Sequence, residues 1–399
     1  MINPSASGWI DKFLVGNQEH IIDFQDDYLA FYDSCRKSGF IYGYVVDIPL
    51  NEPIESKKWS YDEITKVGFL NALYAVFTLE HKSNSPTNFL ISLYEFYKII
   101  QPENLNFIKK MLPESSKSAR LEQIIDERIQ TNQNSLSKNF SHIITNALLF
   151  IDVIAYHYFL KNTDLPKDYL KNIESDCIKI VSLALTIKPH KSKYDELVIK
   201  LFENSIRYTK FATVDTLDLE SLKLQKHTEL LERLYLLDIA QMALWSDQQL
   251  EKSEIVFLNA IRTDLDLSHE LLKNSIDSMD LFIKKYKDEI PFFNYSNPIK
   301  HFYDQANKNV TKLIIRNKDR LSKEIKESGE LMQLLAKSTA KDLSKEEKKK
   351  VKKQLLDICK SIPSLTIFLL PGGSLLLPIL IKFIPQLLPS AFNENLEDD

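Results

Sequence analysis

The apolar positions of this 399-residue chain recur at helical intervals over most of its length. Between residues 60 and 112 they lie three or four residues apart, which places them on one face of a helix. The same spacing returns between Leu230 and Ala240 and again in residues 304–340, where it predicts one long helix. Phe40–Ile48 is aromatic and β-branched, but a single strand cannot form a sheet, so we expect a buried extended segment there. The pattern predicts an all-α fold.

Glycine usage strengthens this prediction and narrows the chemistry. The chain has eight glycines, and none lies in the 260 residues from Phe69 to Ser328. Loops that cradle phosphates and turns of the Asn-Gly type both need glycine. The sequence therefore argues against nucleotide-loop enzymes in that region and favours a multi-helical soluble body.

The C-terminal part carries the strongest functional signal. Ser361 to Ile381 is an uncharged run of 21 residues, and a helix needs about 20 residues to cross the hydrocarbon core of a bilayer. Proline removes a helical hydrogen bond, so this Pro/Gly-interrupted hydrophobic segment is a kinked span, a re-entrant hairpin, or a hairpin packed on the soluble part. The residues that define the predicted membrane segment are Pro363, Pro371, Gly372, Gly373, Pro378, Lys382, Pro385, Pro389 and Phe392.

Charged residues flank this segment asymmetrically. Eight lysines lie between residues 341 and 360, whereas four acidic residues follow Phe392. Lysines beside a membrane segment favour the cytoplasmic side and attract anionic lipid. Ser344 and Glu347 form the pattern of a capping box, which opens a basic helix with an apolar face of Val351, Leu355, Ile358 and Ile362. Membrane lipid is therefore an expected partner.

These motifs resemble the membrane segment of the LETM family, the leucine-zipper, EF-hand-containing transmembrane proteins of the mitochondrial inner membrane. There a basic helix opening L-[ST]-x-x-E precedes a proline-interrupted apolar segment that ends F-P-x-x-L-P-S-x-F. Here the helix opens with Leu343–Glu347, and Pro385 to Phe392 matches the ending, with Ile384 inserted after Phe383. The resemblance covers about the last 60 residues.

The resemblance implies a placement and several functions. The whole chain is similar to bacterial proteins called LETM-related and biofilm-associated, which implies the bacterial inner membrane with most of the chain cytoplasmic; a wholly cytoplasmic protein is the alternative. The family implies cation/proton exchange or ribosome binding. Its ribosome-binding domain follows the membrane segment, whereas this sequence ends seven residues after Phe392.

A second, shorter resemblance lies in the middle of the chain. Asp247, Leu250 and Glu254 match the interhelical motif of tellurite-resistance TerB-type helical domains, with Gln248 in place of the glycine. Asp247 and Glu254 provide too few oxygens for a metal; instead we expect Asp247 to cap a helix and Glu254 to lie on a solvated face. The predicted regions are an N-terminal helical domain (1–139), TerB-like helical modules (140–295), a long helix and a basic helix (296–360), the hydrophobic segment (361–392) and an acidic tail (393–399).

The remaining chemistry points away from catalysis. Three distant cysteines and eight scattered histidines form no metal or nucleophile motif, and we expect His157 to be a core residue. The net charge of −4 argues against direct DNA binding. We therefore expect a non-enzymatic, membrane-associated scaffold or interaction protein without cofactors. The alternatives are ion exchange, which lacks an acidic residue in 361–392 and would need a homo-oligomer, and a ribosome-binding adaptor with a ribosomal or other protein partner.

Overall fold

The chain folds into helices. Its structure, a computed structural model, describes residues 2–82, 85–101, 116–129, 146–188, 219–244, 250–287, 310–340 and 343–362, with 365, 380, 381 and 384. Within these residues the only β-pairing is an isolated bridge between Ile21 and Leu50, so the predicted all-α class is confirmed. The predicted boundaries near residues 139 and 295 lie outside the described residues and stay predictions.

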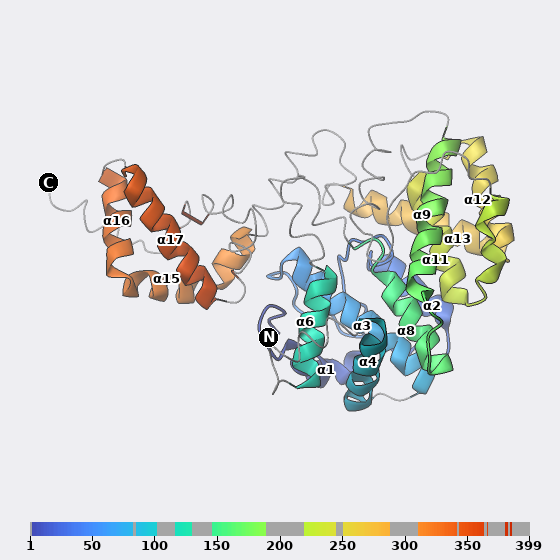
Figure 1. Cartoon of the computed structure of the whole chain (residues 1–399), viewed down its shortest axis with the longest axis horizontal. Coiled ribbons are helices and arrows are strands. Elements are labelled where there is room, and N and C mark those ends of the chain that lie inside the picture. The colour runs from blue at the N-terminus through green and yellow to red at the C-terminus, as the bar shows by residue number, and fades with distance from the viewer. Residues whose placement is uncertain are drawn as a thin grey trace.

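The helices divide into two groups, each with its own apolar core. We call the described residues from 2 to 287 the body, and those from 310 to 384 the C-terminal module. The module lies to one side of the body (Figure 1), and the two sets of core residues share no member. The body contains α1 (Trp9–Asn17), η1 (Gln18–His20), α2 (Tyr28–Lys37), α3 (Tyr61–His81), α4 (Pro86–Ile100), α6 (Lys117–Ile129), α8 (Phe150–Asn162), α9 (Tyr169–Ile187), η3 (Glu220–Leu222), η4 (Leu224–Lys226), α11 (Leu230–Leu244), α12 (Lys252–Asp264) and α13 (His269–Tyr286).

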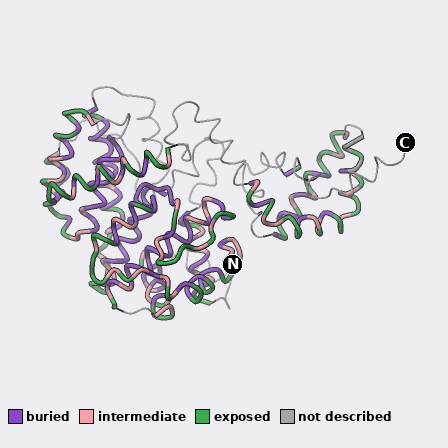
Figure 2. The backbone as a smooth tube through the Cα atoms, turned by 180° about the vertical axis from the view of Figure 1, so that it is seen from behind, coloured by how far each residue is buried: buried purple, intermediate pink, exposed green. Residues whose placement is uncertain are grey.

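Aromatic side chains fill the centre of the body. The ring of Phe150, at the start of α8, lies 5.3 to 6.5 Å from the rings of Phe31, Tyr32, Phe40 and Tyr235. These rings come from α2, the turn after it, and α11, so one residue joins parts of the chain that are far apart in sequence. Figure 2 shows the same result for the whole body, where buried backbone lies inside and exposed backbone outside. Truncating such a residue to alanine typically costs about 3–5 kcal/mol.

The segment after α2 is a turn followed by buried irregular chain. Gly39 and Gly43 have φ of +79° and +75°, and a Cβ at Gly43 would lie 2.7 Å from the backbone nitrogen of Ala147. Glycine is needed there both for the backbone conformation and for the close approach of another chain segment. Val45 and Ile48 are buried without forming a strand, as predicted for this stretch.

Two buried arginine–aspartate pairs connect helices across the body. Arg36 on α2 donates to both carboxylate oxygens of Asp238 on α11, at 2.8 and 2.9 Å. Arg128 on α6 pairs in the same way with Asp152 on α8. Removing one partner of such a pair leaves a buried charge uncompensated, which costs about 3–5 kcal/mol. These pairs therefore fix which helices lie side by side.

Candidate functional site

The C-terminal module is a small helical bundle with a dry core. It comprises helical residues 310–316, α15 (Lys318–Glu327), α16 (Gly329–Ala340) and α17 (Lys345–Ser361). The single long helix predicted over 304–340 is wrong, because the chain breaks at Asn317 and at Ser328. The breaks let α15 and α16 turn back and bury their apolar faces together with α17, which one straight helix could not do.

The basic helix α17 has the predicted start and the predicted buried face. The Ser344 hydroxyl accepts from the Glu347 amide at 3.2 Å, and the Glu347 carboxylate accepts from the Ser344 amide at 2.8 Å. Lys337 of α16 lies 2.5 Å from the same carboxylate, and these bonds lower the pKa of Glu347 to about 2. The predicted apolar face is buried at all four positions, Val351, Leu355, Ile358 and Ile362.

The opposite side of α17 presents lysines to solvent. Lys345, Lys348, Lys349 and Lys352 are exposed and have no ion-pair partner among the described residues. Their spacing of three and four residues places them on one face of the helix. We call these four residues the lysine stripe; it extends for about 10 Å at 1.5 Å per residue.

Other lysines of α17 are neutralised within the module. Lys350 lies 3.0 Å from Glu330 of α16, and Lys360 lies 2.7 Å from Asp357. These pairs flank the lysine stripe without using any of its members. The stripe is therefore the part of α17 whose positive charge remains available to an external anion.

The predicted membrane segment is described at four positions only. Pro363, Pro371, Gly372, Gly373, Pro378, Lys382, Pro385, Pro389 and Phe392 all lie outside the described residues. Leu365, Leu380 and Ile384 are buried in the core of the module beside α17, whereas Ile381 is 41% exposed. Where it is described, the segment thus packs against the module. In the described part of the chain no helix combines the length and the apolarity needed to cross a membrane.

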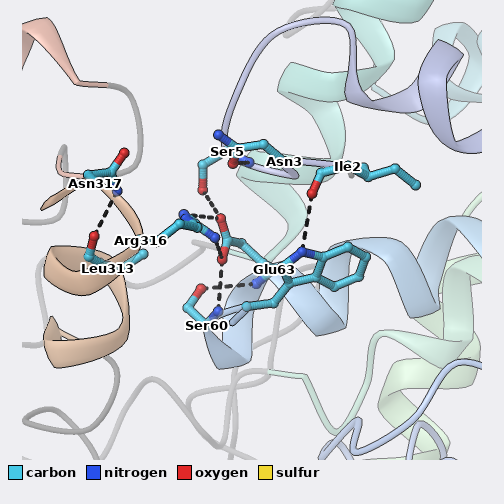
Figure 3. A network of polar contacts seen from close by, with 9 residues as sticks. Ile2, Asn3, Ser5, Ser60, Glu63, Leu313, Arg316 and Asn317 are labelled. Carbon is cyan, nitrogen blue, oxygen red and sulfur yellow. Dashed lines mark hydrogen bonds and ion pairs between the residues drawn. The ribbon is translucent and has the colours of Figure 1, made fainter. Parts of the chain in front are cut away.

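One ion pair joins the module to the body. Arg316, at the end of helical residues 310–316, donates to both carboxylate oxygens of Glu63 at 2.7 Å (Figure 3). Glu63 is 1% exposed and also accepts from the Ser5 hydroxyl at 2.6 Å and the Ser60 amide at 2.8 Å. Burial would raise the pKa of Glu63, but the bonds from Arg316 and Ser5 outweigh it and lower the pKa.

The carboxylate of Glu63 therefore has two structural roles. As the third residue of α3 it closes a capping box with Ser60, and it is at the same time the receptor for the module's arginine. Capping fixes the side chain before the arginine arrives, which lowers the entropy cost of the junction.

The TerB-like motif holds only partly. Asp247 and Gln248 lie outside the described residues. The prediction that Glu254 lies on a solvated face is wrong: it is 3% exposed, and its carboxylate accepts from the Glu251 amide at 2.8 Å in a capping box at the start of α12. In the described residues no three His, Cys, Asp or Glu side chains converge on a metal-sized site.

Two buried histidines pair with carboxylates. His157 lies in the core, as predicted, with Nε2 3.0 Å from a Glu80 oxygen. His227 has Asp176 at 3.1 Å from Nε2 and Glu232 at 3.1 Å from Nδ1. Burial would lower the pKa of His227, but the two carboxylates outweigh it and raise the pKa. The sequence did not predict this cluster, because Asp176 lies 51 residues from His227.

Comparison with known proteins identifies one region. Residues 343–399 match the family model described as LETM1-like, RBD, the ribosome-binding domain of LETM1-like proteins. The C-terminal region is thus LETM-related. The matched span contains α17 and the uncharged segment, rather than beginning after that segment as the family resemblance implied. No curated protein and no solved structure matches the chain, and the biofilm-associated and TerB-like resemblances stay predictions.

Proposed function

We propose that this chain is a LETM-related ribosome-binding adaptor without catalytic activity, in which the C-terminal module contacts the ribosome and the helical body holds a second partner. The observation that carries the proposal is the match of residues 343–399 to a ribosome-binding family model. That match begins one residue before the Ser344 cap of α17, so it includes the basic helix and part of the module's core.

The test is co-sedimentation of the purified full-length chain with purified bacterial ribosomes through a sucrose cushion. We expect the chain to enter the ribosome pellet at physiological ionic strength and to stay in the supernatant when ribosomes are omitted. A chain that stays in the supernatant with a saturating excess of ribosomes would contradict the proposal.

We also propose that the adaptor is held at the cytoplasmic face of the bacterial inner membrane. The uncharged run of 21 residues and the lysines before it support this placement. The burial of Leu365, Leu380 and Ile384 supports contact through a limited part of the segment rather than a continuous span. Cell fractionation followed by an alkaline carbonate wash tests it: a protein that is found entirely in the high-speed supernatant before the wash is not membrane-held.

A further inference from the structure

Positive charge is concentrated in the C-terminal module. Residues 310–362 contain 15 Lys and Arg against 8 Asp and Glu, a net charge of +7. The whole chain has a net charge of −4, so all other residues together carry −11. The overall acidity of the chain thus hides a strongly basic part, and a basic surface on an acidic protein marks a binding site for a polyanion.

Within the module, the lysine stripe is the feature best suited to such a partner. Its four ammonium groups are exposed, lie on one face of α17, and lack carboxylate partners among the described residues. The side chains of lysine bind phosphate as point charges and need no fixed donor geometry. A row of them therefore fits the repeating phosphates of a nucleic-acid backbone.

The packing of α17 favours RNA over a lipid bilayer. An amphipathic helix that lies on a membrane buries its apolar face among the acyl chains. Here that face is already used, since Val351, Leu355 and Ile358 are buried against α15 and α16. The stripe can therefore attract an anion electrostatically, but α17 has no free apolar face to insert into a bilayer.

We infer that Lys345, Lys348, Lys349 and Lys352 form a binding surface for the phosphate backbone of ribosomal RNA. This inference rests on the proposed ribosome-binding function and deepens it, because it assigns the contact to RNA rather than to a ribosomal protein. The stripe contacts phosphates only, so it binds RNA without reading its sequence.

The experiment compares two full-length variants that lose the same charge. The stripe variant is K345Q/K348Q/K349Q/K352Q. The control variant is K312Q/K318Q/K323Q/K326Q, which changes four exposed lysines outside α17. Glutamine keeps a helix propensity close to that of lysine, and circular dichroism with thermal melts verifies that both variants fold. A third variant, with arginine at the four stripe positions, restores the charge.

Binding is measured against salt concentration with three probes: purified ribosomes, a generic RNA duplex, and vesicles containing anionic lipid. Each phosphate contact contributes about 0.7–0.9 to the slope of log K against log salt. We expect the stripe variant to lose about 3 to 4 from that slope for ribosomes and for the duplex. The control variant and the arginine variant should keep the slope of the unchanged chain.

Each other result has one meaning. If the stripe variant binds ribosomes with an unchanged slope, the inference is wrong while the proposed function stands. If the unchanged chain does not bind ribosomes but binds the duplex through the stripe, the proposed function fails and the phosphate surface stands. If the stripe is needed for vesicles and not for RNA, it is a lipid surface and the inference is overturned.

Discussion

The guanidinium of Arg316 and the carboxylate of Glu63 meet across the junction between module and body, 253 residues apart in sequence, through two parallel hydrogen bonds of 2.7 Å. The apolar cores on either side share no residue. Domains with a small shared interface move relative to each other by default. This ion pair is therefore a principal determinant of where the lysine stripe sits relative to the body.

Replacing Arg316 by alanine should free the module. Removing one partner of a buried pair costs about 3 kcal/mol, which raises the population of the open arrangement roughly a hundredfold. Fluorescent labels on cysteines introduced at exposed Val15 in the body and Lys326 in the module report the change as lost energy transfer.

Arg320→Ala is the matched control, because Arg320 bonds to the Ser361 carbonyl inside the module and not to the body. It should leave the energy transfer unchanged. Equal loss in both variants would show that Arg316 acts by stabilising the module and not by joining it to the body.

The junction should also open in acid. The pKa of Glu63 is lowered from its ordinary 4.5 in the folded protein, so its contribution to stability is present above pH 4.5 and is lost as the pH falls through the lowered value. Energy transfer between the same labels should therefore fall below pH 4.5. Glu63→Gln should remove this step and show weak transfer at every pH; an acid step that persists in this variant would assign it to another carboxylate.

His227 should make the body less stable at high pH. Its pKa is raised above the ordinary 6.5, so the stabilisation from Asp176 and Glu232 is complete below pH 6.5 and is lost as the pH rises through the folded value. Chemical unfolding monitored at pH 6 and pH 9 measures this loss. His227→Gln should unfold at similar denaturant concentrations at both values, after correction for the pH dependence of a His20→Gln control, whose histidine is more exposed.

The sequence predicted what depends on neighbouring residues. The capping box of Ser344 and Glu347 and the buried face of α17 follow from spacing within one helix, and both are confirmed. The Arg316–Glu63 junction could not be predicted, because both residues look like ordinary surface charges until the chain is folded. Asp152 and Asp238 gave a partial signal, since an acid inside a very apolar helix needs a partner, but nothing local names Arg128 or Arg36. The wrong placement of Glu254 has the same origin: a charged residue on a helix is normally solvated, and here its own cap buries it.

The ordered part of the uncharged segment should stabilise the module. Leu380 is fully buried in the module core, whereas its neighbour Ile381 is 41% exposed. Truncating a buried leucine to alanine costs about 2–5 kcal/mol, and truncating an exposed isoleucine costs much less. Cys359 on α17 provides a natural reporter, since it is a free, buried cysteine whose pKa burial raises to about 12, and a thiol reacts only when the core opens.

Alkylation of Cys359, located by mass spectrometry, should therefore be at least about 30-fold faster in Leu380→Ala than in the unchanged chain, given a loss of 2 kcal/mol or more. Ile381→Ala should react within a few-fold of the unchanged rate. Membrane insertion of this stretch makes the opposite prediction, because Leu380 would then contribute nothing to the core around Cys359. Equal rates for the two variants would exclude the packed arrangement and leave insertion as the explanation of the uncharged run. Carrying out the same measurement with vesicles present distinguishes a segment that stays packed from one that leaves the core on reaching lipid: only in the second case does Cys359 of the unchanged chain become reactive.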